Sequence, residues 1–119
     1  MQCIFISLGA PKHKLIMGIP FYGRSFVLKD PNSHKPGQSA KSESEGFAGE
    51  FTDSKGYVAY FEVCNLAKSE SWIQNKDDTG NVYMHNPENG HWVGYDTPET
   101  VERKVNFLLR QFDFFKGKK

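Results

Sequence analysis

Apolar positions first gather in one nearly unbroken run, "KLIMGIPFY" at residues 14–22. Such a run fits a strand with both faces buried, because neither face then alternates with polar residues, and it is typical of a parallel sheet covered by helices. Pro20 has no backbone N–H for a sheet ladder, which a strand tolerates near its end. The run therefore predicts a buried strand over residues 14–22, which ends on the "YGR" of Tyr22 to Arg24.

The apolar pattern then gives way to a long polar stretch at residues 29–50, "KDPNSHKPGQSAKSESEGFAGE". Ser, Gly, Pro and charged residues dominate this stretch, and these residue types favour turns over regular elements. We expect a long loop or excursion across the surface. Loops of this length inside compact domains are usually functional or disordered.

Several shorter segments have strand-like or turn-like patterns. "GYVAYFEVC" at 56–64 is rich in β-branched and aromatic residues, which predicts either a strand or a strand that runs into a short helix over 58–67. "NVYMH" at 81–85 and "HWVGYD" at 91–96 alternate in polarity and are joined by the turn-forming "NPENG", so they predict an antiparallel hairpin. "NKDDTG" at 75–80 is expected to form another turn.

Residues 97–111 have the clearest helical pattern. Thr97 is a good N-cap, Pro98 suits the first helical position, and Glu99 suits the positive end of the helix dipole. The apolar residues recur at helical spacing and predict one apolar face. They are Val101, Val105, Leu108 and Phe112.

Composition narrows the class of protein. The chain has 119 residues, of which 38% are hydrophobic, enough for the core of one ordinary domain. A formal net charge of +1 gives no electrostatic argument for binding nucleic acid or an anionic membrane. No apolar run approaches the roughly 18 residues of a membrane span. The opening "MQCIFISLGA" lacks a basic leader and has a short apolar run, so we expect no signal peptide in this chain.

Cysteines and histidines are the remaining candidates for chemistry. Cys3 and Cys64 form a disulfide only if the fold brings them together, so a disulfide and two free thiols both stay open. The histidines, at positions 13, 34, 85 and 91, lack the spacing of a zinc finger or a metalloprotease, and each is most simply a surface residue. The residues therefore predict no metal and no cofactor.

Three segments together resemble family 18 of the glycoside hydrolases, the chitinases and chitinase-like lectins. "GAPKHKLIMGIPFYGRSF" is similar to the seventh barrel strand of the family, with its "KL-x-x-G-x-P-x-YGR-x-F" pattern. "GYVAYFEVC" is similar to the "AYYEIC" segment of the chitinase insertion domain. "HWVGYDTPETVERKVNFL" is similar to the "QWVGYDDxESVxxKVxYL" segment that closes the insertion and opens the seventh helix. The segments occur in the order of the family, over about residues 8–110.

The resemblance implies a fold. We expect a fragment of an α/β barrel of the TIM type that carries an α+β chitinase insertion domain. The expected divisions are a partial barrel segment with strand seven at residues 1–28, the insertion domain at 29–92, and a second partial barrel segment with the amphipathic helix and tail at 93–119.

The resemblance also implies a substrate-binding site. The active site of such a barrel lies at the carboxyl ends of its strands, and family members use the Tyr and Arg at the positions of Tyr22 and Arg24 to contact bound sugar. From the residues alone, the simpler explanation is an arginine paired with a carboxylate and a tyrosine packed under a loop. Tyr57 would either add an aromatic surface to the cleft or belong to the core. Ser54 stands where many members carry a Glu that touches substrate.

The implied function is hydrolysis of β-1,4-linked N-acetylglucosamine polymers. The expected partner is chitin or a chito-oligosaccharide, without a cofactor, and the family is extracellular. In its substrate-assisted mechanism the acetamido oxygen of the substrate attacks the anomeric carbon while a Glu protonates the leaving oxygen. That Glu ends a "DxxDxDxE" motif, which the printed sequence lacks, so we expect no catalytic residue in this chain. Glu62, in "YFEVC", is interpreted as structural.

Two alternatives remain for the function. One is a chitinase-like lectin that binds chitin or an oligosaccharide without cutting it, and the other is a truncated gene product with no independent function. The family partner of Cys64 lies beyond the eighth strand, so the resemblance implies a free thiol unless Cys3 reaches it. Trp92 is expected to pack between the insertion domain and the barrel.

Overall fold

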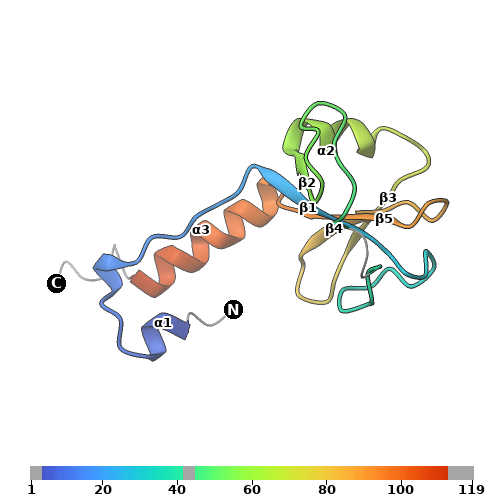
Figure 1. Cartoon of the computed structure of the whole chain (residues 1–119). Coiled ribbons are helices and arrows are strands. Elements are labelled where there is room, and N and C mark those ends of the chain that lie inside the picture. The colour runs from blue at the N-terminus through green and yellow to red at the C-terminus, as the bar shows by residue number, and fades with distance from the viewer. Residues whose placement is uncertain (1–3, 42–44, 113–119) are drawn as a thin grey trace. The chain divides into compact units, whose positions relative to one another are not determined.

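The computed structural model of the chain describes residues 4–41 and 45–112 (Figure 1). The chain divides into two compact units, one of residues 20–100 and one that combines the residues up to 19 with those from 101 onward. The elements follow one another as α1 (Ile4–Ser7), η1 (Lys12–Lys14), β1 (Tyr22–Val27), β2 (Tyr57–Ala59), α2 (Tyr60–Ala67), β3 (Ile73–Lys76), β4 (Val82–His85), β5 (His91–Tyr95) and α3 (Pro98–Phe112).

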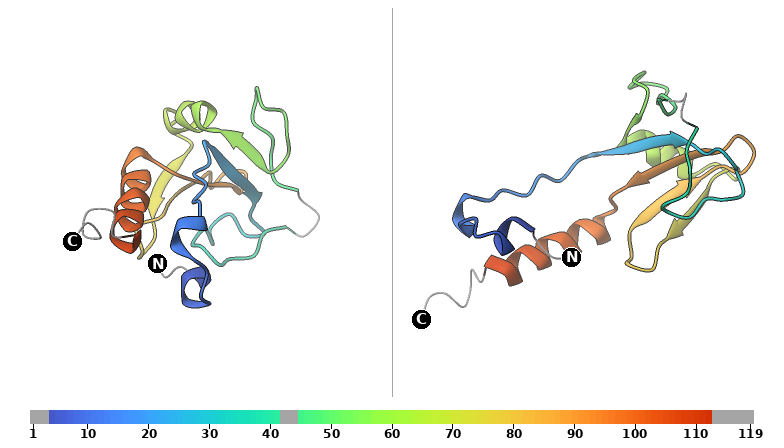
Figure 2. Two further views of the ribbon diagram at one scale, coloured as in Figure 1. Left: turned by 90° about the vertical axis from the view of Figure 1, so that its left-hand side faces the viewer. Right: turned by 60° about the horizontal axis from the view of Figure 1, so that its bottom comes forward.

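The unit of residues 20–100 is built on one five-stranded sheet. Its strands lie in the order β2-β1-β5-β4-β3, and every neighbouring pair is antiparallel. β4 and β5 form the predicted hairpin, and Figure 2 shows β1 (light blue) beside β5 (orange). The expected α+β character of this region is therefore confirmed, whereas the pattern did not reveal β3 or the place of β1 in the same sheet.

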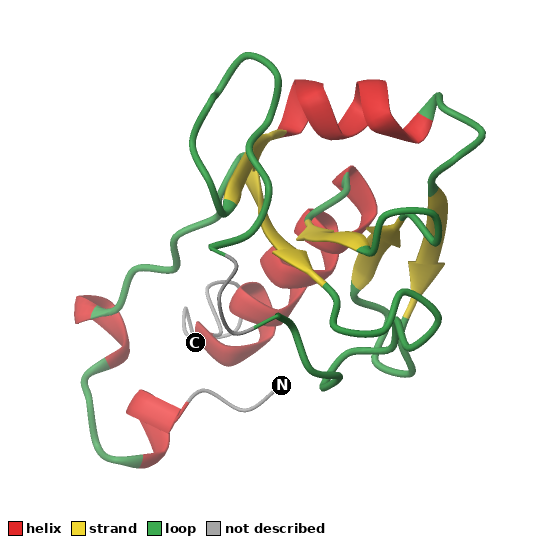
Figure 3. Ribbon diagram, turned by 45° about the vertical axis from the view of Figure 1, so that its right-hand side comes forward, coloured by secondary structure: helices red, strands yellow, loops and turns green. Residues whose placement is uncertain are grey.

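One face of the sheet carries the core. Side chains alternate between the two faces of a strand, so Val58 of β2, Met84 of β4 and Val93 of β5 share a face, and all three are fully buried. Val63 of α2 packs against them, and α2 lies over this face (Figure 3). The partly buried residues around this core are Phe47, Leu66, Trp72 and Tyr95.

β2 runs directly into α2, as one of the two sequence alternatives predicts. Glu62, in the first turn of α2, accepts a hydrogen bond from the backbone N–H of Ala59 at 2.8 Å. An acidic side chain that reaches back to the residue before a helix satisfies one of the free N–H groups at its start. The local sequence thus ends the strand and begins the helix within one residue.

The strand expected over residues 14–22 is wrong. Residues 15–21 lie in neither a helix nor a strand, and Ile16 and Phe21 are 96% and 81% exposed. A buried strand needs partners on both sides, and no described strand pairs with this run, while Pro20 has no N–H to contribute. The strand begins at Tyr22 instead, where exposed and buried residues alternate as on a sheet with one covered face.

The second unit holds α1, η1 and most of α3. α3 covers the predicted helix to within one residue at each end. Its start is capped as expected, because Thr97 Oγ1 accepts a hydrogen bond from the Thr100 N–H at 3.2 Å, and Thr100 Oγ1 accepts one from the Thr97 N–H at 2.8 Å. Within this unit, Lys12 Nζ donates to the Gln111 carbonyl at 2.7 Å.

Within the polar stretch expected at residues 29–50, residues 29–41 form a surface loop after β1. Its two ends are held together, because Lys29 N donates to Ser39 O at 3.0 Å and Lys41 N donates to Val27 O at 2.8 Å. Leu28 and Ala40 form an isolated antiparallel bridge between these bonds. Residues 29–41 therefore make a closed loop that leaves β1 and returns to it.

Candidate functional site

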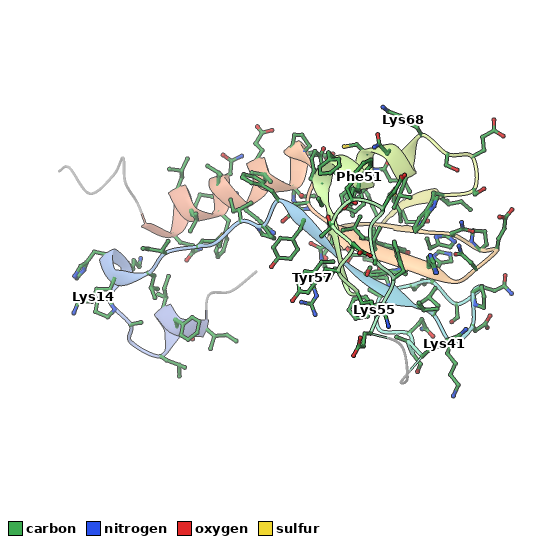
Figure 4. All side chains as sticks on the ribbon, turned by 45° about the horizontal axis from the view of Figure 1, so that its top comes forward. Lys14, Lys41, Phe51, Lys55, Tyr57 and Lys68 are labelled. Carbon is green, nitrogen blue, oxygen red and sulfur yellow. The ribbon has the colours of Figure 1, made fainter. Side chains whose placement is uncertain are left out.

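The pairing of β1 with β2 brings the three sequence-predicted site residues to one face of the sheet. Arg24 lies directly opposite Tyr57, and Tyr22 precedes Arg24 by two residues, so all three side chains project from the face that α2 does not cover. Tyr22 and Tyr57 are 45% and 37% exposed, and Arg24 is exposed too. Figure 4 labels Tyr57, whose side chain projects beside β1.

These three side chains contact one another and form what we call the Tyr–Arg cluster (Tyr22, Arg24 and Tyr57). Arg24 Nη1 donates to the Tyr57 hydroxyl at 2.6 Å, and the guanidinium carbon lies 4.5 Å from the centroid of the Tyr57 ring. The ring of Tyr22 meets that of Tyr57 edge to face, with centroids 5.4 Å apart and planes at 63°. The alternative of Tyr57 as a core residue is therefore wrong, because its ring lies on the solvent side of the sheet.

The cluster combines two kinds of binding group. Its tyrosine rings offer apolar surface with a hydroxyl at one end. A guanidinium has five N–H donors, and the bond to Tyr57 uses one of those of Arg24. The contact with Tyr57 holds the guanidinium over the ring, where the cation is attracted to the π-electrons. Such a surface suits a ligand that has both apolar faces and acceptor oxygens.

A hollow of about 390 Å³ lies beside the cluster on the same face, and we call it the Gly94 hollow. Gly94 of β5 lies between Arg24 of β1 and Tyr83 of β4, and because it has no side chain it leaves a gap between its neighbours. The residues that line the hollow include Tyr22, Arg24, Tyr83, Trp92, Asp77 and Asp96. The cluster and the hollow thus share Tyr22 and Arg24.

Sequence patterns assigned Trp92 to packing and did not single out Gly94 or Asp96. Trp92 does pack, edge to face on Phe26 at 5.7 Å and stacked on Tyr83 at 5.3 Å between ring centroids. The hollow forms because the register between β5 and β1 places Gly94 directly opposite Arg24, the arginine of "YGR". That register depends on contacts between segments far apart in the chain.

The loop of residues 29–41 contacts this face through His34. The His34 ring stacks on His85 of β4, its Nδ1 lies 3.1 Å from the Tyr83 hydroxyl, and its carbonyl accepts from Trp92 Nε1 at 3.0 Å. His85 is only 4% exposed, so the expectation that each histidine is a surface residue is wrong for His85. Burial, and secondarily the neighbouring His34, lowers the pKa of His85 from its ordinary value.

Glu62 is structural, as expected. Its Oε1 accepts from the N–H groups of Phe51 at 2.6 Å and Thr52 at 2.9 Å, and its Oε2 accepts from the Thr52 hydroxyl and the Ala59 N–H. Burial acts to raise the pKa of this carboxyl, but the hydrogen bonds, led by that of the Thr52 hydroxyl, outweigh it and lower the pKa to about 2. A carboxylate held in this way is a poor proton donor.

Ser54 lies in the turn before β2, at the position where the resembling family often carries a Glu. Its side chain is exposed, and its carbonyl accepts from the Tyr57 N–H at 3.2 Å. The backbone of Ser54 therefore helps to position Tyr57.

Cys64 is a free thiol, and Cys3 lies outside the described residues. Within residues 4–41 and 45–112, no three His, Cys, Asp or Glu side chains are grouped so that they could hold a metal ion. None of the helices in those ranges is long and apolar enough to cross a lipid bilayer.

Comparison with known proteins places the chain among glycosyl hydrolases. The model of "Glycosyl hydrolases family 18" matches residues 1–112. The chain is 42% identical to "Probable chitinase 10" of Drosophila melanogaster over 102 residues, which are 86% of this chain and 4% of that protein. It is 36% identical to the human "Chitinase-3-like protein 2" over 104 residues, which are 87% of this chain and 25% of that protein. The chain thus spans a quarter or less of the length of these curated relatives.

Two solved structures have the same arrangement of elements. The Group IV chitinase of Ostrinia furnacalis, in complex with allosamidin, superposes with a TM-score of 0.77 and 36% identity, covering 88% of this chain and 28% of that one. A mutant of the plant class V chitinase from Cycas revoluta, in complex with (GlcNAc)3, superposes with a TM-score of 0.68 and 31% identity, covering 89% of this chain and 28% of that one. These two chitinases therefore share the fold of this chain over most of its length.

Proposed function

This chain belongs to family 18 of the glycosyl hydrolases, and on that premise we propose that its Tyr–Arg cluster forms part of the wall of a chitin-binding cleft. The proposed ligand is a chain of β-1,4-linked N-acetylglucosamine. One observation carries the proposal: Tyr22 and Arg24 contact Tyr57, more than thirty residues away in sequence, on an exposed face. A structural arginine would be expected to pair with a carboxylate, whereas Arg24 donates a hydrogen bond to a tyrosine hydroxyl.

The chemistry of the cluster suits this ligand. A pyranose ring has apolar C–H faces that pack on tyrosine rings, and its hydroxyl and acetamido oxygens accept hydrogen bonds. Arg24 has further N–H groups for those oxygens, and the Tyr57 hydroxyl, which accepts from Arg24, can donate its own proton to the sugar. The exposed edge of Tyr22 extends the aromatic surface along β1.

We further propose that the complete protein is an extracellular chitinase in which these 119 residues bind sugar and residues elsewhere supply the catalytic acid. The printed sequence has no "DxxDxDxE" motif. Glu62 accepts four hydrogen bonds and is held as a carboxylate. The chain by itself should therefore bind chito-oligosaccharides without hydrolysing them.

Binding of chitotetraose, measured by titration calorimetry, tests the role of the cluster. We expect Arg24→Gln and Tyr57→Ala each to weaken binding about tenfold, which is about 1.4 kcal/mol. Phe61→Ala is the matched control, because Phe61 is an exposed aromatic residue of α2, 55% exposed and outside the cluster. A wild-type chain that does not bind, or cluster variants that bind as the Phe61 variant does, would contradict the proposal.

Hydrolysis of a chromogenic chitobioside tests the proposal that this chain binds the sugar without cleaving it. The wild-type chain is expected to release no chromophore above background. Turnover that copurifies with the chain and is lost in Glu62→Gln would overturn the assignment of Glu62 as structural. Binding without turnover is also what a lectin of this family would show, so the same assay on the complete protein separates a chitinase from a lectin.

A further inference from the structure

We propose that the sugar-binding surface of the Tyr–Arg cluster continues along β1 to Phe26, which forms a further subsite for the same chain of N-acetylglucosamine. The proposal rests on the function proposed above and deepens it, because it makes longer oligomers the preferred ligands. Its basis is the place of Phe26 in the sheet, the exposure of its ring, and the hydrogen-bond donors of the loop beside it.

Phe26 lies on the same strand and the same face as the cluster. Side chains alternate between the two faces of a strand, so Tyr22, Arg24 and Phe26 all project from the face that α2 does not cover. At a rise of about 3.4 Å per residue, Phe26 lies about 14 Å from Tyr22 along β1. An extended ligand that follows the strand would therefore contact the tyrosines, the guanidinium and the phenylalanine in turn.

The ring of Phe26 is open to a ligand. Phe26 is 40% exposed, which is close to the 45% and 37% of Tyr22 and Tyr57. Its ring meets that of Trp92 edge to face, with centroids 5.7 Å apart and planes at 61°, and this contact helps to hold it in place. An exposed phenylalanine forgoes the free energy of burying its ring, and contact with the apolar face of a sugar would recover part of it.

A hollow of about 240 Å³ lies at Phe26, and we call it the Phe26 hollow. Trp92 and Pro36 line both this hollow and the Gly94 hollow, which in turn shares two residues with the cluster. The Phe26 hollow and the cluster are therefore parts of one continuous surface. The other residues that line the Phe26 hollow are Leu28, Lys35, Gly37, Gln38 and Ala40.

The loop of residues 29–41 adds hydrogen-bond donors to the rim of the Phe26 hollow. Lys35 and Gln38 are exposed there, and the Gln38 N–H donates to the Lys35 carbonyl at 3.2 Å, so one turn holds both. The Ser33 hydroxyl donates to the Gln38 side-chain oxygen at 2.8 Å. No hydrogen bond or ion pair among the described residues uses the NH2 group of Gln38 or the ammonium group of Lys35, so both can donate to a ligand.

The Phe26 hollow and the cluster therefore suit the same sugar chemistry. Each combines an exposed aromatic ring with N–H donors for hydroxyl and acetamido oxygens. A polymer of N-acetylglucosamine presents the same unit along its whole length. Once one end of such a chain is bound at the cluster, contact of the other end with Phe26 is intramolecular and raises the overall affinity.

NMR titration of the chain with chitobiose and with chitohexaose tests this subsite. The dimer is too short to contact both ends of a surface about 14 Å long, whereas the hexamer can. The hexamer also binds the cluster in more than one register, which raises its affinity without any new contact. The informative quantity is therefore the ratio of the two affinities in the wild type, compared with the same ratio in a variant.

Phe26→Leu is the diagnostic variant, because it keeps an apolar side chain against Trp92 and removes the flat ring. We expect it to lower the ratio about fivefold, the loss of one aromatic contact, with little effect on chitobiose. Phe26→Tyr retains the ring and should retain the ratio. Phe61→Leu is the matched control, because it removes an exposed ring from α2, outside the proposed surface, and should leave the ratio unchanged.

The two tryptophans of the chain give a readout that needs no variant. Trp92 contacts Phe26 and lines the hollow, whereas Trp72 packs against the core beside Phe47. We expect the indole N–H signal of Trp92 to shift when chitohexaose saturates the wild-type chain, while that of Trp72 stays in place.

The outcomes separate this proposal from the function on which it rests. If chitohexaose binds but the Trp92 signal does not shift, or if Phe26→Leu keeps the wild-type ratio, the subsite proposal is wrong while the chitin-binding proposal stands. If Phe61→Leu lowers the ratio as much as Phe26→Leu does, the subsite proposal is again wrong. If neither oligomer binds the wild-type chain, the proposed function itself fails.

Discussion

The imidazole rings of His34 and His85 lie face to face, with centroids 3.9 Å apart and planes 7° from parallel. His34 belongs to the loop of residues 29–41, and His85 is buried in β4. The amide nitrogen of Asn75 donates to the Ile73 carbonyl at 3.0 Å and lies 2.8 Å from His85 Nδ1. An N–H donor at that position matches a neutral His85 whose Nδ1 accepts, so the loop is docked on an uncharged ring.

Acidification should therefore destabilise the unit of residues 20–100. Because the pKa of His85 is lowered in the folded protein, first by burial and then by His34, the unfolded chain takes up a proton first, as the pH falls through about 6.5. The contribution of His85 to the free energy of unfolding should be level above that pH, decline below it, and stop declining below the folded pKa of His85. Urea unfolding at a series of pH values checks this.

A variant tests whether the loss of stability at low pH comes from the stacked pair of His34 and His85. His85→Gln should flatten the decline in part, and the remainder belongs to His91, whose pKa is also lowered, chiefly by burial. His13→Gln should leave the pH profile unchanged, because His13 is exposed in η1. Trypsin cleavage after Lys29, at the start of the loop of residues 29–41, should accelerate on acidification in the wild type, and a cleavage rate independent of pH would argue against release of the loop.

Glu62→Gln should destabilise the fold by about 2–3 kcal/mol. The change replaces a carboxylate oxygen by an NH2 group, which would face N–H or O–H donors from Thr52 and Ala59. Since the folded pKa of Glu62 is lowered to about 2, its contribution is complete above about pH 5 and is lost as the pH falls toward 2. Chemical denaturation measures the loss, and Glu50→Gln, an exposed neighbour, should change stability by less than about 0.5 kcal/mol.

Met84→Ala should cost about 2–5 kcal/mol of unfolding free energy, because Met84 is fully buried between β3 and β5 and the truncation leaves a cavity. Ile73→Ala on β3, where the side chain is 46% exposed, should cost distinctly less. Equal losses in the two variants, measured by denaturation, would mean that the core does not lie on the face that α2 covers.

Hydrogen exchange should divide the chain at Tyr22. Amides in β1, β4 and β5 are paired in the sheet and should be protected, whereas among the described residues those at 16–21 donate no backbone hydrogen bond and should exchange rapidly. Mass spectrometry of peptides from a dilute sample makes the comparison. Protection of residues 16–21 equal to that of β1 would show that this run finds a partner outside the contacts described here.

Local signals in the sequence predicted those elements whose causes are local. The cap at Thr97, the "NPENG" turn and the passage from β2 to α2 were all recoverable from neighbouring residues. The strand predicted at 14–22 is wrong because an apolar run indicates only that its residues favour burial. It does not indicate which segment of the chain packs against them. β3 was missed because "IQNK" has no apolar alternation, and its pairing with β4 is what makes it a strand.

The candidate site divides in the same way. Tyr22, Arg24 and Tyr57 were named from family resemblance, but their mutual contact follows from the register of β1 with β2, which no single segment encodes. Gly94 shows the difference most clearly, since a glycine in a strand has no pattern of its own and gains meaning only from Arg24 and Tyr83 beside it.

β1 and β5 are adjacent and antiparallel, with Arg24 paired to Gly94, so the part of this unit from residue 20 to residue 96 begins and ends at neighbouring strands. Neighbouring strands lie about 4.8 Å apart, and segments whose two ends lie close together are tolerated as insertions in other proteins. Residues 20–96 should therefore be transplantable as a cassette into a hairpin turn of an unrelated scaffold. The graft would carry the Tyr–Arg cluster and the Gly94 hollow with it, because every residue of both lies inside the cassette.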